Sequence, residues 1–249
     1  MATPIVAAAL VFAFTTVLTI AGVGSAFIVI PTFYWLGVPL TEAMAIGLLL
    51  NAISMTFASV NYIRYKLVMF RTAVPIIMLA VVFSPLGAWS TRFLPKNALI
   101  LAFVIFLVFA ASMMLFYKPG KKEEGQSSGG KELKTGVGLG IGAGYLGGLL
   151  GVGGGNIIVP VLVWLGFDPK KAAATTAFIV VFSSLAGFFG HAAMGTINWN
   201  LLAFTAVGSV AGALLGSWLM HWKLDAAQVK KIIGIILYAI AAKMAWGLL

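Results

Sequence analysis

Eight long apolar runs restrict how this chain can fold more than any other feature. Each run reaches or approaches the roughly 20 residues that a helix needs to cross the hydrocarbon layer of a membrane. The runs cover residues 4–36, 42–63, 72–89, 98–116, 133–165, 172–194, 201–220 and 232–249. Because 61% of the residues are hydrophobic and only 9% are charged, a soluble fold would leave much apolar surface in water. The sequence therefore predicts an all-α polytopic protein of the lipid bilayer.

The charged residues agree with a membrane protein. The formal net charge is +10, but the Lys and Arg residues lie in short loops and one linker, as the positive-inside rule expects, so we predict no nucleic-acid partner. No Lys or Arg precedes Arg64, so we expect the first run to be a retained membrane segment and not a cleaved signal peptide. The absence of cysteine excludes disulfides, thiol catalysis and Cys-based metal sites, and no motif suggests a cofactor.

An internal repeat relates the two halves of the chain. GVGSAFIVIPTFYWLG at 22–37 matches GVGGGNIIVPVLVWLG at 151–166, an offset of 129 residues. Without a gap, the same offset aligns residue types that chance supplies less readily than Ala or Leu: Pro31 with Pro160, Trp35 with Trp164, Gly87 with Gly216 and Trp89 with Trp218. The chain is therefore expected to contain two related membrane domains.

The boundary between these domains is a polar segment. Residues 118–134 are charged and rich in Gly and Ser, which predicts a flexible loop outside the bilayer. We therefore assign the first transmembrane repeat to 1–117, the linker to 118–134 and the second repeat to 135–249.

Each repeat is predicted to hold a first helix, a glycine break, a short helix and three full transmembrane helices. The first helices are expected at 4–21 and 136–150, and the short helices at 27–36 and 157–165. A short helix of about 15 Å cannot cross about 30 Å of hydrocarbon. The first helix and its short partner therefore make either one broken crossing or a hairpin that enters and leaves on one side.

Loop charge favours the hairpin. In the hairpin topology one side of the membrane receives thirteen of the sixteen Lys and Arg residues, whereas the broken crossing divides them nine to seven. The positive-inside rule therefore predicts inverted repeats, a cytoplasmic linker and both termini outside.

The glycine breaks at 22–25 and 151–156 are the sharpest local features. A half-helix that starts at such a break near mid-membrane offers unpaired N–H groups and the positive end of a dipole, which favour an anion. We predict substrate-binding residues here: Gly22, Gly24, Ser25, Gly153, Gly154, Gly155 and Asn156. The alternative is that these glycines only permit tight turns or close helix packing. The four-residue spacings from Gly136 to Gly148 and from Gly208 to Gly216 are interpreted as packing faces.

Polar residues on the following helices are further candidates. Asn51, Ser54, Thr175, Thr176, Ser183 and Ser184 are expected either to face the substrate cavity or to bond their own backbone. His191 is either a proton carrier or anion ligand, which would allow proton coupling, or a histidine that only bonds a loop.

The six carboxylates lie at predicted helix ends (Glu42, Asp168, Asp225) or in the linker (Glu123, Glu124, Glu132). Their absence from the membrane interior favours an anionic or neutral solute over a cation, although backbone carbonyls can also bind sodium.

These residues resemble the TauE/SafE family of membrane permeases, the sulfite exporter family. The resemblance is strongest in GVGGGNIIVPVLVWLGFDPKKAAATTAF, followed by SSLAGFFGHAAMGTINW, which includes Gly195 and Trp199. The first half departs from it at Ser25 and Ala26, where glycines would stand, and has Tyr62 at the position equivalent to His191. The resemblance implies transport of sulfite, sulfonates or sulfoacetate and a role for the following residues: Gly153, Gly154, Gly155, Thr175, Thr176 and His191.

Three functions remain open at this point. The first is a secondary transporter of small sulfur-containing anions in a prokaryotic cytoplasmic membrane, and the second is a passive anion channel that uses the same site. The third is an intramembrane hydrolase that uses Ser25 and His191. Direction of transport and oligomeric state are not indicated by the sequence.

Overall fold

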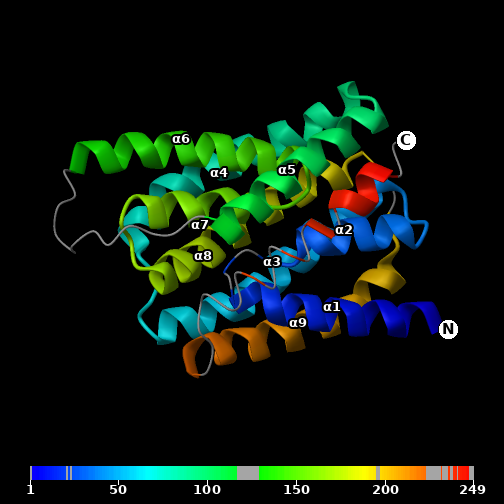
Figure 1. The fold of residues 1–249 in the computed structure, drawn as a ribbon, viewed down its shortest axis with the longest axis horizontal. Coiled ribbons are helices and arrows are strands. Elements are labelled where there is room, and N and C mark those ends of the chain that lie inside the picture. The colour runs from blue at the N-terminus through cyan, green and yellow to red at the C-terminus, as the bar shows by residue number, and fades with distance from the viewer. Residues whose placement is uncertain are drawn as a thin grey trace.

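The computed structural model describes residues 2–20, 22, 24–116, 129–194 and 197–222, together with 231, 235, 238–239 and 241–246. Helices and their connections make up this described part (Figure 1). The elements are α1 (Ala2–Ile20), α2 (Ala26–Trp35), α3 (Leu40–Arg64), α4 (Phe70–Ser90), a 3-10 turn η1 (Thr91–Phe93), α5 (Lys96–Phe116), α6 (Gly129–Leu149), α7 (Gly155–Trp164), α8 (Pro169–Ala192) and α9 (Trp199–Trp222).

Four of these helices are long and apolar enough to cross a membrane. They include the stretches Leu40–Arg64, Phe70–Phe93, Lys170–Ala192 and Trp199–His221. Shorter apolar stretches occur in α1, α5 and α6. The predicted all-α polytopic fold is confirmed for the described residues. Half of the last predicted crossing, 232–249, lies outside them.

The repeat is visible in the helix boundaries. The short helices α2 and α7 begin and end at residues that the offset of 129 makes equivalent, and the same holds for the first residues of α3 and α8 and of α4 and α9. The first and short helices end within one residue of their predicted C-terminal limits. The two halves therefore share one order of elements.

One boundary differs from the prediction. Helix α6 begins at Gly129, so residues 129–134 of the predicted linker are helical. Lys131, Glu132 and Lys134 are good helix formers, and they extend the apolar helix beyond its first membrane glycine. The rest of the linker, 118–128, lies outside the described residues.

The two halves pack into one another. Helix α1 lies along α9, and α6 lies along α4, so the first helix of each half packs against the other half (Figure 1). A Cβ atom at Gly208, Gly212 or Gly216 would meet the backbone of Ala8, Phe12 or Thr16, and equivalent close approaches occur between α6 and α4. This confirms the predicted packing role of these regularly spaced glycines.

The contacts also fix the helix directions. Gly208 lies against Ala8 and Gly216 against Thr16, so α1 and α9 run in parallel. The Ser209 hydroxyl donates to the Leu50 carbonyl and the Asn61 amide to the Ser217 hydroxyl, so α3 is parallel to α9 as well. Because α1 and α3 run the same way, the short α2 between them returns the chain to the side from which it came. The described helices therefore have the hairpin arrangement.

The equivalent helices α3 and α8 run in opposite directions. Leu48 of α3 lies against Gly187 of α8. One turn later on α3, the Asn51 side chain bonds Ser184, which lies one turn earlier on α8. Inverted repeats require this relation between equivalent helices. The orientation of the repeats in a bilayer stays a prediction.

The apolar side chains in the first part of α2 are buried. In α2, Ile28, Val29, Ile30 and Phe33 are each at most 1% exposed. The irregular backbone that precedes this helix is therefore surrounded by protein, which is the setting in which non-helical backbone is tolerated at membrane depth.

Candidate substrate site

Both glycine breaks need glycine for conformational and steric reasons. Gly24 and Gly153, which the repeat makes equivalent, have φ values of +81° and +72°, in the left-handed region. Gly154, at φ +78°, is the N-cap of α7. A Cβ at Gly22 would collide with the backbone of Ala173. The breaks are thus tight turns against neighbouring helices, and Ala21 and Val23 lie outside the described residues.

Asn51 joins the two breaks at the centre of the molecule. Its Nδ2 atom would lie 2.9 Å from a Cβ built on Gly24 and 3.0 Å from one built on Gly153. The same Nδ2 donates to the Ser184 hydroxyl over 3.0 Å. The break of each half therefore approaches a side chain of α3, and the amide links α3 to α8. The structure brings together predicted site residues that are 102 positions apart in the sequence.

The hydroxyl of Ser183 holds the second break in place. Its Oγ donates to the Gly153 carbonyl over 2.8 Å, and its own carbonyl accepts from the Ser84 hydroxyl over 2.8 Å. Helices α4 and α8 and the second break are therefore connected by two consecutive hydrogen bonds. Ser183 orients the glycine backbone by this contact.

Two predicted residues have other partners. Ser54, the repeat equivalent of Ser183, donates to the Asn51 carbonyl of its own helix over 3.1 Å. The Thr175 hydroxyl accepts from the Met69 backbone N–H over 3.0 Å, and so it ties α8 to the connection before α4. Ser54 therefore shows the backbone-bonding alternative, whereas Thr175 accepts from the backbone of another segment, a partner that the sequence did not indicate.

Several buried polar atoms of the predicted site residues have no hydrogen-bond partner. They are Ser25 Oγ, Asn51 Oδ1, Thr176 Oγ1 and both amide atoms of Asn156. Ser25 precedes α2 and makes no side-chain cap, and Asn156 is the second residue of α7, directly after Gly155. Each of these side chains is at most 2% exposed. Unpaired buried hydroxyls also occur at Thr15, Thr19 and Ser59 on α1 and α3. Because a buried polar group without a partner costs about 1–3 kcal/mol, the unpaired groups of Ser25 and Asn156 at the two helix N-termini are compatible with a place for a ligand.

His191 makes the same contact as its repeat equivalent. Its Nε2 lies 2.8 Å from the Gly148 carbonyl, near the end of α6. In the first half, the Tyr62 hydroxyl donates to the Thr19 carbonyl over 2.8 Å, near the end of α1. Since the offset of 129 relates both partners, the shared contact supports the structural interpretation of His191. Its Nδ1 has no partner, and a role as proton carrier stays a prediction.

The carboxylates lie away from the breaks wherever the structure describes them. Glu42 Oε1 accepts from the Asn198 backbone N–H over 2.8 Å, and Asp168 caps the start of α8. Both positions are helix ends, as predicted. Glu123, Glu124, Asp225 and the motif residue Gly195 lie outside the described residues.

The hydrolase alternative requires a bond between Ser25 and His191. The Ser25 hydroxyl has no partner, and the His191 ring bonds a backbone carbonyl through Nε2 while its Nδ1 has no partner. The pair therefore does not form the contact by which a base activates a nucleophile.

Sequence reasoning missed Ser84. It is one of three hydroxyl residues on an apolar helix, and its repeat equivalent is Ala213, so the alignment of the halves does not distinguish it from other serines. Only the packing of α4 against α8 shows that it bonds the Ser183 carbonyl.

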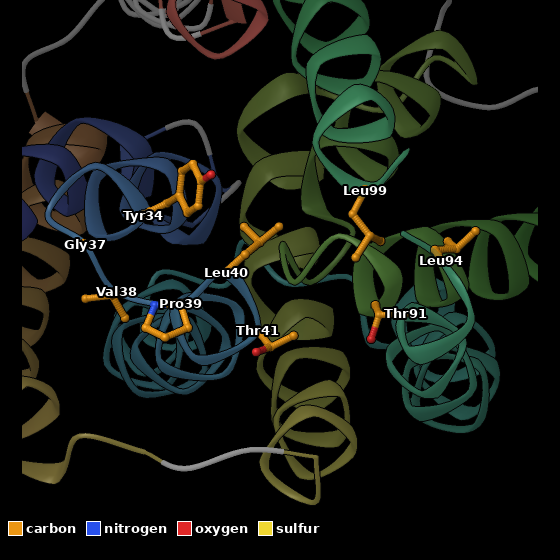
Figure 2. Close-up of a pocket in the computed structure, with 9 residues that line it drawn as sticks. All are labelled: Tyr34, Gly37, Val38, Pro39, Leu40, Thr41, Thr91, Leu94 and Leu99. Carbon is orange, nitrogen blue, oxygen red and sulfur yellow. The ribbon is translucent and has the colours of Figure 1, made fainter. Parts of the chain in front are cut away.

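A separate hollow of about 550 Å³ opens at the far end of α2 (Figure 2). It is lined by Tyr34, Gly37, Val38, Pro39, Leu40, Thr41, Thr91, Leu94 and Leu99. These residues belong to the end of α2, the start of α3, η1 and the start of α5. The hollow therefore lies at the opposite end of α2 from the glycine break and is distinct from the predicted site.

Comparison with known proteins relates this chain to one family of membrane proteins. Residues 6–244 match the family model described as Sulfite exporter TauE/SafE. "Probable membrane transporter protein YunE" of Bacillus subtilis is 28% identical over 92% of this chain and 92% of its own length. "Sulfite exporter TauE/SafE family protein 1" of Arabidopsis thaliana is 32% identical over 48% of this chain and 28% of its own length. No solved structure matches.

Proposed function

Because the chain belongs to the sulfite exporter TauE/SafE family, we propose that it is a secondary transporter of small sulfur-containing anions such as sulfite or organosulfonates. One observation carries the proposal: Ser25 and Asn156, at the starts of the two short helices, have buried polar atoms without partners. A solute that enters between the breaks would receive hydrogen bonds from Ser25, Asn156 and Thr176. The family of the chain and these unpaired hydrogen-bonding groups both support a transporter of small anions.

The electrostatics of the breaks favour an anion. The N-terminus of a helix carries roughly half a positive charge, and α2 and α7 both begin at the breaks. Among the described residues, the carboxylates of α3 and α8 and their N-caps lie at the helix ends and not beside the breaks. The site therefore presents positive potential without a competing negative side chain.

The helix arrangement supports alternating access. Each half contributes one break, and the two halves meet where Asn51 of α3 bonds Ser184 of α8. Movement of one repeat against the other would open the site first to one side of the membrane and then to the other. The Asn51–Ser184 hydrogen bond lies across the interface that such a movement has to change.

Counterflow in proteoliposomes tests the proposal. Vesicles preloaded with sulfite, sulfoacetate, taurine, thiosulfate or sulfate would receive the labelled solute outside. We expect transient accumulation with at least one sulfur-containing anion. Conductance without counterflow would identify a passive channel instead, and no flux of any solute in vesicles that contain correctly inserted protein would contradict the proposed substrates.

We propose that the linker is cytoplasmic and that both termini are outside. The chain has no cysteine, so a single introduced cysteine reports its position without background labelling. In intact cells, a membrane-impermeant maleimide is expected to label Thr41→Cys, at the start of α3, and to leave Gln126→Cys in the linker unlabelled. The reverse pattern would contradict this orientation.

A further inference from the structure

The Asn156 side chain sets a condition on the solute. Both its Oδ1 and its Nδ2 are buried without a partner, and the residue is 2% exposed. Because both atoms are unpaired, the condition does not depend on which way the amide is turned. The amide needs one acceptor for its N–H group and one donor for its oxygen. A solute that pairs with it fully must carry both.

Two other unpaired groups of the predicted site residues are compatible with such a solute. The hydroxyls of Ser25 and Thr176 each donate or accept, and neither has a partner. Ser25 is the N-cap residue of α2, but its backbone is in the right-handed helical region and its side chain caps nothing. Neutral groups with both hydrogen-bonding capacities thus stand at both helix N-termini.

The charge of the site is limited to about one unit. Each of the two helix N-termini contributes roughly half a positive charge. The basic residues described on α3 and α8 are Arg64, Lys170 and Lys171, which lie at the ends of these helices. The titratable His191 bonds the Gly148 carbonyl. A singly charged anion is therefore balanced, whereas a dianion would retain about one uncompensated negative charge in a buried place.

We propose, on the basis of the proposed function, that the transported solute is a singly charged oxyanion that also carries a hydrogen-bond donor, and that Asn156 recognises this donor. A sulfonate or sulfite group with an adjacent N–H or O–H pairs with both atoms of the amide. A sulfonate without a donor pairs with the N–H only and leaves the amide oxygen buried and unpaired. A fully deprotonated dianion lacks the donor, and its charge exceeds the roughly one positive unit that the two helix N-termini supply.

Two ligands of the same shape test this inference. Sulfamate and methanesulfonate are both singly charged and differ in an NH₂ group against a CH₃ group beside the sulfonate. We expect sulfamate to inhibit sulfite counterflow about tenfold more strongly than methanesulfonate, because a site that bonds a donor rejects the analogue without it. Sulfate, a dianion without a donor, is expected to inhibit least. All measurements use the full chain in proteoliposomes at one pH.

Variants assign the preference to Asn156. In Asn156→Leu, sulfamate and methanesulfonate are expected to inhibit equally, whereas Asn61→Leu keeps the wild-type ratio because Asn61 bonds Ser217 away from the breaks. If Asn156→Leu fails to insert, the inhibition of the wild type by sulfamate relative to methanesulfonate still tests whether the site requires a donor. Equal inhibition of the wild type by both analogues would overturn the inference but would not contradict the proposed transport function. Absence of counterflow with every sulfur-containing anion tested would instead count against the proposed function.

Discussion

The two halves of this protein follow one plan but differ in their binding chemistry. Where helices touch, the halves agree: Gly87 approaches Tyr145, and its equivalent Gly216 approaches Thr16, the equivalent of Tyr145. At the breaks they differ, because Asn156 of the second half corresponds to Phe27 of the first. The comparison teaches that packing restricts both halves in the same way, while the groups available to a solute need to occur only once.

The largest expected effect tests the first break. Gly24→Ala is expected to abolish counterflow, because the new methyl group would collide with the Asn51 amide. Gly37→Ala is the matched control: its φ of +87° is as unusual for alanine, but no atom lies within 4 Å of the added Cβ. Gly37→Ala should therefore only cost about 1 kcal/mol of stability. Equal transport by the two variants would show that the space at Gly24 is not needed.

A charge at the centre is expected to have the next largest effect. Asn51→Asp keeps the shape of the side chain but places a carboxylate between the breaks, so the apparent affinity for the anion should fall about tenfold or more. Asn61→Asp makes the same change further along α3, beside Ser217, and should alter the affinity little. The apparent KM in counterflow is the measurement. Similar KM values in both variants would place the anion elsewhere.

The third comparison concerns Tyr62 and His191. Tyr62→Phe and His191→Leu should each lower the free energy of unfolding by about 1 kcal/mol, because each removes a hydrogen bond to the end of a first helix. His191→Gln keeps a donor and should retain transport with an unchanged pH profile. Denaturation in detergent measures stability, and flux at several pH values measures the profile. A flattened profile in His191→Gln would instead support the proton carrier.

The smallest expected effect separates two equivalent serines. Ser183→Ala removes the bond to the Gly153 carbonyl and should cost about 1 kcal/mol with a measurable fall in flux. Ser54→Ala removes only a bond within its own helix and should change stability by a few tenths of a kcal/mol. Both variants are compared by thermal denaturation and counterflow. If Ser54→Ala is the more damaging, the two breaks are not organised as the structure indicates.

Much of the fold could be predicted from the sequence. The length of each apolar run fixed the helices, and the glycine runs fixed the breaks, because few other residues adopt a positive φ. The start of α6 was placed too late, since its polar first turn has linker composition but helical propensity. The site was predicted as a region: Asn51, Ser183 and Asn156 were named, but their different roles were not.

The sequence by itself determined which segments are helical, where the chain breaks and that carboxylates are absent from the predicted membrane interior. Only the tertiary structure decided which faces meet: that α1 packs on α9, that Asn51 joins both breaks, and that Ser84 bonds Ser183. The reason is physical. In a membrane protein the lipid-facing and core-facing sides of a helix are both apolar, so the pattern of the sequence does not show which side is buried.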